Sequence, residues 1–265
     1  QELTAAVGRI APVLRALRHA DGGLARFHGG DRGLEGRLEQ ALATSKVKAD
    51  APLSQAMGYT RQSTGRTPVI MDAARPPTGR ESENAHASTL AFELTSGRRP
   101  LVVNCGAGGF FGEDWRRAGR ATASHSTLAI DGYSSSRLGA RQWLSGRQRE
   151  LLADGPTDVR YDRKITSQGL RQQASHNGYA STHGLTHVRT LELSHDGRSL
   201  AGEDLLATLE PADLGRFGSR LAATRGEGIH FVVRFHLHPD ADAALDMAGA
   251  AISIALRSGE IWVFR

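Results

Sequence analysis

The sequence has a single cysteine, almost no lysine and no long apolar run. One cysteine, Cys105, excludes an internal disulfide. It follows an apolar run, and we expect a small buried side chain there rather than a nucleophile, because nothing nearby in the sequence activates its thiol. No apolar stretch approaches the roughly 20 residues of a membrane-spanning helix, so no membrane span is predicted. Neither a GxGxxG nor a Walker pattern is present, which argues against a nucleotide site.

Arginine supplies almost all of the positive charge, and the formal net charge is +5 with a sequence pI of about 9.9. A basic surface suits polyanions such as nucleic acid, anionic lipid or acidic sugar chains. No basic run interleaved with aromatic residues and no nucleic-acid motif is found, so nucleic acid is not the expected partner. An arginine-rich composition inherited from a GC-rich genome is the competing explanation.

The first 50 residues are predicted to be helical. Apolar residues recur at helical spacing over 3–18, and Pro12 is expected to kink or shorten that helix. Asp31 is an N-cap candidate for a second helix that extends to Thr44, although Gly33 and Gly36 weaken it. The stretch 46–52 is predicted to be a linker. We therefore divide the chain into a helical segment, 1–50, and a second domain, 51–265.

From Gly58 onward the pattern is β. The 31 glycines indicate many turns. Strands are predicted at 58–62, 68–73, 89–95, 101–105, 126–131, 170–175, 186–193, 200–208, 229–237, 251–256 and 260–264. Many short strands separated by turn signals predict a mainly β fold, a large antiparallel β-sandwich. Residues 106–124 are predicted to be a long loop, and 137–165 either a solvated insertion or a substrate-facing loop.

Three polar residues lie at the edges of apolar runs: His86, Asn104 and His125. If neighbouring strands bring them to one end of a sheet, two imidazoles and an amide oxygen make a metal site or a catalytic cluster. On spacing alone, three unrelated polar residues at strand ends explain the pattern equally simply.

Several segments of the sequence resemble the heparinase II/III-like family of bacterial polysaccharide lyases. The matching segments run in family order over nearly the whole chain: Gly23–Gly30, Gly58–Arg61, Val69–Ala73, His86–Leu94, Leu101–Gly106, Ala121–Leu128, His176–Tyr179, Gly184–Arg189, Gly202–Asp204 and Arg234–Pro239. The resemblance implies a C-terminal sandwich of the supersandwich type. Residues 1–50 would be the end of an (α/α) toroid whose remainder is missing from this chain.

The resemblance also implies chemistry. Such lyases cleave uronate-containing acidic polysaccharides by β-elimination, with a toroid Tyr as acid or base and a sandwich His across the cleft. His86 and His125 match the two His positions of the family's metal site, and Asn104 stands where an Asp is usual. An amide oxygen binds zinc less well than a carboxylate, so zinc or calcium is implied with that reservation. His86 is alternatively a free catalytic His, or the site is metal-free.

His176-Asn177-Gly178-Tyr179 resembles the family's HxGY turn, which makes His176 and Tyr179 catalytic candidates. Asn177-Gly178 is also a strong turn signal, and the alternative is that the tyrosine packs beside this turn. His187 and Arg189 share one face of a strand, and His236 and His238 share a face of another; both pairs are expected to be structural. Candidates for binding an acidic polymer are Arg116, Arg117 and Arg120.

The function predicted first is therefore a polysaccharide lyase acting on an acidic, uronate-containing glycan. The alternative is a non-catalytic glycan-binding or cell-envelope sandwich, because fold does not secure chemistry. A nucleic-acid binder is a third reading that rests on charge alone. The resemblance implies a periplasmic or secreted protein. Absorbance of the unsaturated product separates the first two readings.

Overall fold

The computed structural model describes residues 2–31, 33–48, 55–144 and 146–265. Two helices open the chain, α1 (Glu2–Ala16) and α2 (Arg37–Ser45). The second begins later than predicted because Gly33 and Gly36 adopt φ values of 76° and 74°, which belong to turns and not to a helix. The predicted domain boundary at 50/51, and much of the predicted linker, lie outside the described residues.

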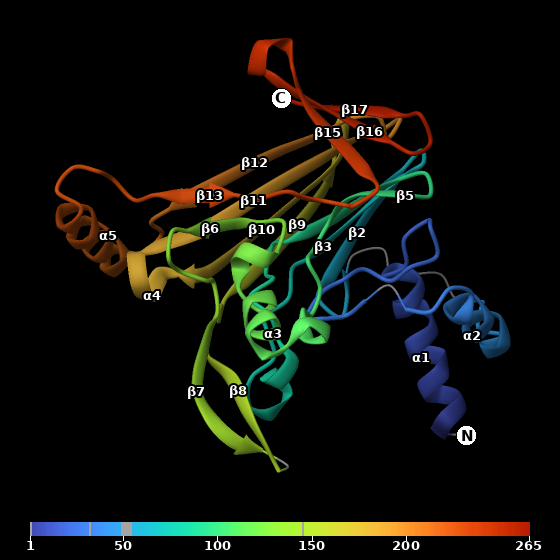
Figure 1. The fold of residues 1–265 in the computed structure, drawn as a ribbon, viewed down its shortest axis with the longest axis horizontal. Coiled ribbons are helices and arrows are strands. Elements are labelled where there is room, and N and C mark those ends of the chain that lie inside the picture. The colour runs from blue at the N-terminus through green and yellow to red at the C-terminus, as the bar shows by residue number, and fades with distance from the viewer. Residues whose placement is uncertain (1, 32, 49–54, 145) are drawn as a thin grey trace.

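Antiparallel sheets follow. The first has the order β1-β2-β3-β4-β5-β14 and the second the order β12-β11-β10-β9. Strand bounds in the first sheet are β1 (Gln55–Ala56), β2 (Tyr59–Thr64), β3 (Thr67–Asp72), β4 (Phe92–Ser96), β5 (Arg99–Val103) and β14 (His236–Leu237). Those in the second sheet are β9 (Val159–Ile165), β10 (Gly169–Tyr179), β11 (Leu185–Ser194) and β12 (Leu200–Ala207). These two sheets form the body of the molecule (Figure 1).

Smaller sheets and helices complete the fold. A third sheet joins β15 (Ala241–Asp246), β16 (Ala251–Leu256) and β17 (Ile261–Phe264), and two-stranded pairs join β6 (Leu128–Ile130) to β13 (Phe231–Val233) and β7 (Arg137–Leu144) to β8 (Arg147–Asp154). Helical elements between strands are η1 (Gly79–Asn84), η2 (Gly109–Phe111), α3 (Glu113–Gly119), η3 (Thr122–Ser124), α4 (Ala180–His183), α5 (Pro211–Ala223) and η4 (Met247–Gly249).

The main core lies between the sheets. Apolar side chains of β3, β4, β5, β10, β11 and β16 meet there, as their alternating patterns predict. Polar groups also cross the core: Gln62 Nε2 donates to the Leu170 carbonyl at 2.7 Å, and Thr60 Oγ1 donates to Gln172 Oε1 at 2.8 Å. These bonds fix the two sheets against each other, while Gln62 Oε1 and Gln172 Nε2 stay buried without a hydrogen-bond partner among the described residues. The predicted β-sandwich is confirmed.

Several regions differ from the prediction. The expected strand 229–237 is split: β13 pairs with β6, and β14 pairs with β5, because the chain leaves one pair and joins another sheet at Arg234. Residues 137–165 contain the β7–β8 hairpin and β9 instead of a loop. Both faces of the hairpin are largely exposed or half-buried, so its sequence lacks the apolar alternation that marks a strand. The predicted loop 106–124 includes η2, α3 and η3.

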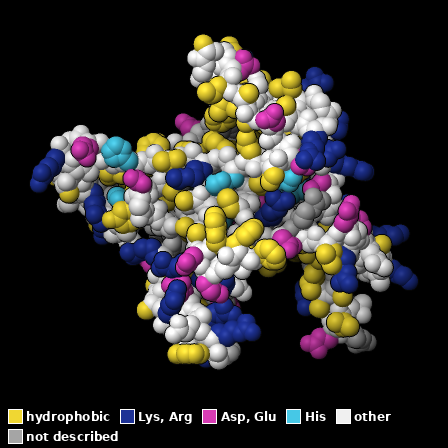
Figure 2. Space-filling view, in the orientation of Figure 1, with side chains coloured by type: hydrophobic (Ala, Val, Ile, Leu, Met, Phe, Trp, Pro, Cys, Tyr) yellow, Lys and Arg dark blue, Asp and Glu magenta, His cyan; other side chains and the backbone are white. Residues whose placement is uncertain are grey.

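Two projections leave the body of the sandwich. The β7–β8 hairpin extends on one side, next to α3, and α1 with α2 extends on the other (Figure 1). Figure 2 shows the surface hollowed between these projections. None of the described helices is long and apolar enough to cross a membrane.

Candidate functional site

Four side chains form a buried group that we call the His86 cluster: His28, Asp72, His86 and His125. Asp72 ends β3, His86 lies between η1 and β4, and His125 directly follows η3. The loop after Phe27 brings in His28, whose Nδ1 accepts a hydrogen bond from the His86 backbone N–H at 3.0 Å. His28 Nε2 lies 3.5 Å from Asp72 Oδ2. His86 and His125 thus lie side by side, as predicted.

A chain of hydrogen bonds sets the tautomers. His125 Nδ1 lies 2.9 Å from the Ala121 carbonyl, which only accepts, so Nδ1 carries the proton. In the neutral ring, His125 Nε2 is then an acceptor, and it lies 3.2 Å from His86 Nδ1. His86 therefore donates through Nδ1, and its Nε2 keeps a lone pair with no hydrogen-bond partner among the described residues. That nitrogen faces Gly29, where a Cβ would lie only 2.9 Å away.

Burial keeps both imidazoles neutral. Desolvation, then the charges of His125 and His28, lower the pKa of His86 to about 2. Burial likewise lowers the pKa of His125 to about 3, although its hydrogen bond to the Ala121 carbonyl acts in the opposite direction. A base whose conjugate acid has so low a pKa takes a proton weakly near neutral pH. His86 Nε2 is therefore suited to accept a hydrogen bond, and poorly suited to abstract a weakly acidic C–H proton.

The side chain of Asn104 bonds to a different set of groups. Its Nδ2 donates to Glu93 Oε1 at 3.2 Å, and its Oδ1 accepts from the Ser126 backbone N–H at 2.9 Å. Glu93 is itself buried. It lies 3.1 Å from His19 Nε2, and it accepts a hydrogen bond from the backbone N–H of Arg26. The amide of Asn104 thus belongs to a structural network that ties the N-terminal segment to β4.

The predicted metal ligands do not fit a zinc or calcium ion in this arrangement. The lone pair of His125 Nε2 is directed at His86 Nδ1–H, and the amide oxygen of Asn104 is taken by a backbone N–H. Over the ranges that the structure describes, no group of three or more His, Cys, Asp or Glu side chains is placed to hold a metal ion. The amide oxygen of Asn104 is thus not free to bind a metal in this arrangement, the metal site stays a prediction, and no reaction step is derived through a metal.

His176 belongs to a second buried chain of polar groups. Its Nδ1 accepts from the Gly178 backbone N–H at 3.0 Å, so its Nε2 carries the proton and lies 3.4 Å from His187 Nδ1. His187 Nε2 in turn donates to Asp204 Oδ1 at 2.7 Å. Every ring nitrogen in this chain has a partner, and burial lowers the pKa of both histidines. This arrangement is structural, as expected for His187, and gives His176 no free nitrogen for catalysis.

Tyr179 is also enclosed. Its side chain has no exposed surface and packs with Leu128, Ile130 and Leu185, and its hydroxyl donates to the Leu128 carbonyl at 3.1 Å. Burial raises the pKa of the phenol well above its usual range. Tyr179 is therefore a core residue, and this arrangement does not support the catalytic role predicted for it.

The three arginine candidates differ in what they can reach. Arg120 is 2% exposed, and its guanidinium donates to the carbonyls of Ala85, Ser82 and Glu150, so it holds η1 and β8 in place and is not available to a polymer. Arg116 bonds the Glu83 carbonyl and Asn84 Oδ1. Arg117 is more than half exposed, beside Glu150 at 3.1 Å.

Sequence reasoning missed His28 and Asp72, and it misplaced Cys105. His28 lies in a segment quoted for the family resemblance, and Asp72 closes an apolar strand, so each carried a weak signal that only the fold connects. Cys105 is exposed and not buried, because the chain turns out of β5 at Asn104.

The comparison with protein families decides the identity of the fold. The family described as "Heparinase II/III-like, C-terminal" matches residues 46–265. This chain belongs to the heparinase II/III-like family. The predicted resemblance is thereby confirmed, and the β-sandwich described above is the family's C-terminal domain.

Two solved structures share this fold, and one curated protein matches the chain in sequence. Heparan sulfate lyase HepC from Pedobacter heparinus has a TM-score of 0.59 at 15% identity over 94% of this chain and 37% of that chain. A heparinase III has a TM-score of 0.55 at 12% identity over 90% of this chain and 35% of that chain. FtsZ-localized protein C of Caulobacter vibrioides is 32% identical over 277 residues, covering 100% of this chain and 44% of that protein. The chain thus spans less than half the length of each.

Proposed function

We propose that this chain is a glycan-binding β-sandwich that engages an acidic polysaccharide and does not cleave it unaided. The observation that carries the proposal is a group of exposed rings on η2 and α3. Phe110, Phe111 and Trp115 are 96%, 72% and 63% exposed, and neighbouring rings lie 5.5 and 6.0 Å apart. We call these three residues the aromatic face.

The aromatic face has the chemistry of a sugar-binding surface. Ring faces carry negative electrostatic potential and attract the electropositive C–H groups of a sugar ring, and large apolar rings left in water mark an interaction site. Arg117 is more than half exposed on α3, where a carboxylate or sulfate of the polymer would compete with Glu150 for its guanidinium. Ala107, three residues before Phe110, lies near the His86 cluster: a Cβ at Gly29 would lie 2.9 Å from His86 and 3.4 Å from Ala107.

Elimination requires more than this chain offers. The carboxylate of the uronate must be neutralised, a base must remove the proton beside it, and an acid must protonate the leaving oxygen. His86 remains as one candidate group, and a pKa of about 2 makes it a weak base. Cleavage by β-elimination, predicted from the resemblance, would need groups supplied from outside this chain.

Binding and cleavage are tested together. The chain is titrated with a uronate-containing sulfated polysaccharide and with a neutral polysaccharide, while absorbance of unsaturated product is followed. We expect binding to the acidic polymer alone, without product. A Phe110→Ala/Trp115→Ala variant should bind about tenfold or more weakly, because each stacking ring contributes roughly 1 kcal/mol. Trp143→Ala, on the exposed β7, is the control. Product formed by the chain alone, or equal binding by both variants, contradicts the proposal.

A second function has one specific observation in its favour. The similarity to FtsZ-localized protein C extends over the whole of this chain, at 32% identity, and not over the sandwich alone. We infer association with FtsZ as the second candidate. Co-sedimentation of the chain with FtsZ filaments tests it, and chain that stays in the supernatant at all filament concentrations excludes it.

A further inference from the structure

A pocket of about 380 Å³ lies where turns of two sheets meet, and three arginines line it. Arg66 belongs to the β2–β3 turn, Arg98 to the β4–β5 turn, and Ser258 to the β16–β17 turn, while Arg99 begins β5. The His86 cluster is at the opposite ends of these strands, because His86 precedes β4 whereas Arg98 follows it. The pocket is therefore separate from the site described above.

The charge in this pocket is uncompensated. Its lining includes no acidic residue. None of the three guanidinium groups has an ion pair or side-chain hydrogen bond within the part of the chain that the structure describes. By contrast, exposed arginines such as Arg137 and Arg160 have carboxylate partners. An anion bound among these arginines would supply the counter-charge that the lining of the pocket lacks.

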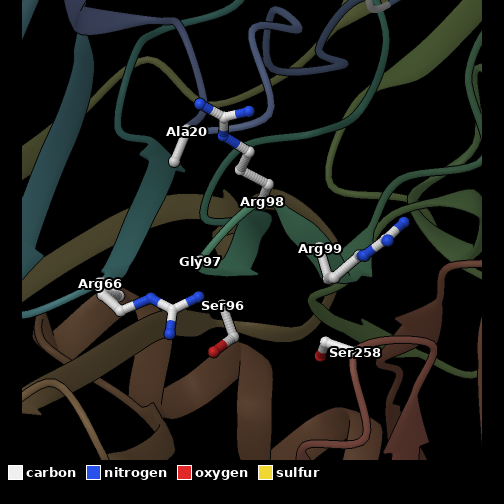
Figure 3. A pocket seen from close by; sticks show the side chains of 7 residues that line it. All are labelled: Ala20, Arg66, Ser96, Gly97, Arg98, Arg99 and Ser258. Atoms are coloured by element: carbon white, nitrogen blue, oxygen red, sulfur yellow. The ribbon is translucent and has the colours of Figure 1, made fainter.

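The β4–β5 turn leaves room for Arg66. A Cβ at Gly97 would overlap Arg66 Nη2, so the guanidinium lies directly against the turn. Gly97 also has a φ of 56°, which disfavours other residues. Figure 3 shows Arg66 directed toward Ser96, Arg98 extending toward Ala20 and Arg99 directed away from Arg66. The long stems of Arg98 and Arg99 are exposed and can turn toward an anion held by Arg66.

One carboxylate touches the pocket wall. Ser96 Oγ donates to Glu260 at 2.7 and 2.9 Å, and Glu260 also accepts from Trp262 Nε1 at 3.2 Å. This carboxylate is held by neutral donors and makes no ion pair with the three arginines in the described residues. It reduces the positive potential without cancelling it, since three cations face one anion.

We propose that this pocket binds an oxyanion, namely the sulfate or carboxylate group of an acidic saccharide. The proposal deepens the proposed function, on which its saccharide part rests: the same polymer class would have a second, charge-selective subsite remote from the aromatic face. The volume is within the range of pockets that hold small ligands, of about 300–1,000 Å³. Guanidinium forks match planar carboxylates and tetrahedral sulfates in two-bond geometry.

The test uses the whole chain with two probes, inorganic sulfate and a short sulfated uronate oligosaccharide. Arg66→Ala/Arg98→Ala is compared with Arg160→Ala/Arg198→Ala, which removes the same charge from exposed positions outside the pocket. Thermal unfolding is followed with sulfate and with chloride at equal ionic strength, and saccharide binding by calorimetry. We expect the pocket variant to lose the sulfate-specific rise in Tm and one saccharide equivalent, with affinity there falling about tenfold per arginine.

Two further variants probe the geometry. Gly97→Ala keeps every charge but displaces Arg66, and should lose the sulfate effect as the double variant does. Glu260→Gln removes the one carboxylate at the wall and should bind sulfate several-fold more tightly. Circular dichroism confirms that each variant is folded.

The outcomes separate the two proposals. If the pocket variant and the control behave alike with both probes, the oxyanion pocket is overturned even where the chain binds polysaccharide. If sulfate protection depends on Arg66 and Arg98 but no acidic saccharide binds, the pocket stands and the proposed function, with its saccharide assignment, fails.

Discussion

At the scale of single residues, buried ionic groups in this molecule serve the fold. Arg189 is 1% exposed; its Nε and Nη2 bond both oxygens of Asp204 at 2.8 Å, and its Nη1 donates to the carbonyls of Leu90 and Ser126. This one side chain therefore joins β11 and β12 to segments around β4 and β6. A buried arginine with a paired charge and bonded N–H groups costs the folded state little free energy. Loss of its anion strongly destabilises the folded state.

Asp204→Asn is predicted to destabilise the chain by about 3–5 kcal/mol, because Arg189 would keep its charge and lose its counter-ion. Urea denaturation measures the change. Asp158→Asn, which removes an exposed partner of Arg160, is the control and should cost under about 1 kcal/mol. Equal losses in the two variants would contradict the role assigned to Arg189.

Gly29 is a second position with one defined constraint. Its φ of 76° and the 2.9 Å approach of His86 Nε2 leave no space for a side chain. Gly29→Ala should destabilise the chain by about 1 kcal/mol or more and change the His86 ring resonances in NMR spectra. Gly33→Ala, also at positive φ but with open space around its Cβ position, tests whether the strain alone has these effects.

At the scale of elements, the N-terminal segment is attached to the first sheet by packing of Phe27 on Ile70 and Ala91 and by specific polar contacts. His19 bridges Glu93 at 3.1 Å and Thr95 at 3.0 Å, and Arg61 donates to the Arg18 carbonyl at 2.6 Å. The β-sandwich has its own core, so the segment can loosen without loss of the sheets.

His19→Ala is predicted to increase hydrogen exchange in α1 and in residues 17–26 while leaving the sheets protected. Buried Glu93 would lose one donor, at a cost of about 1–3 kcal/mol for the attachment of the segment. His195→Ala, which removes an exposed histidine, is the matched control. Uniform loss of protection across the chain would show that the segment and the sandwich unfold as one unit.

At the scale of the whole molecule, buried neutral histidines make stability depend on pH. Burial lowers the pKa of His86 to about 2 and of His125 to about 3, and also lowers those of His176 and His187, whereas unfolded histidine titrates near 6.5. The unfolded chain therefore binds more protons below about pH 6.5. Stability contributed by these groups is present above that pH and is lost as the pH falls toward the folded pKa values.

We predict that the free energy of unfolding falls steadily between pH 7 and pH 4, with each such histidine adding a slope of up to about 1.4 kcal/mol per pH unit. Urea denaturation at several pH values measures the slope. His125→Gln should flatten it, whereas His195→Gln should leave it unchanged. A free energy that does not vary over this range would contradict the neutral tautomers assigned to the His86 cluster.

The sequence alone determined the strands with one apolar face, the two helices and the family, because burial of alternate residues is written into local periodicity. It also indicated that His86 and His125 meet. The β7–β8 hairpin carries no such pattern, since both its faces are solvated, and only the tertiary structure showed it. Tertiary contacts likewise determined that the polar groups of Asn104, His176, Tyr179 and Arg120 are engaged in structural hydrogen bonds. Whether a polar side chain is free to react depends on which distant donors and acceptors fold against it, and no local pattern records that.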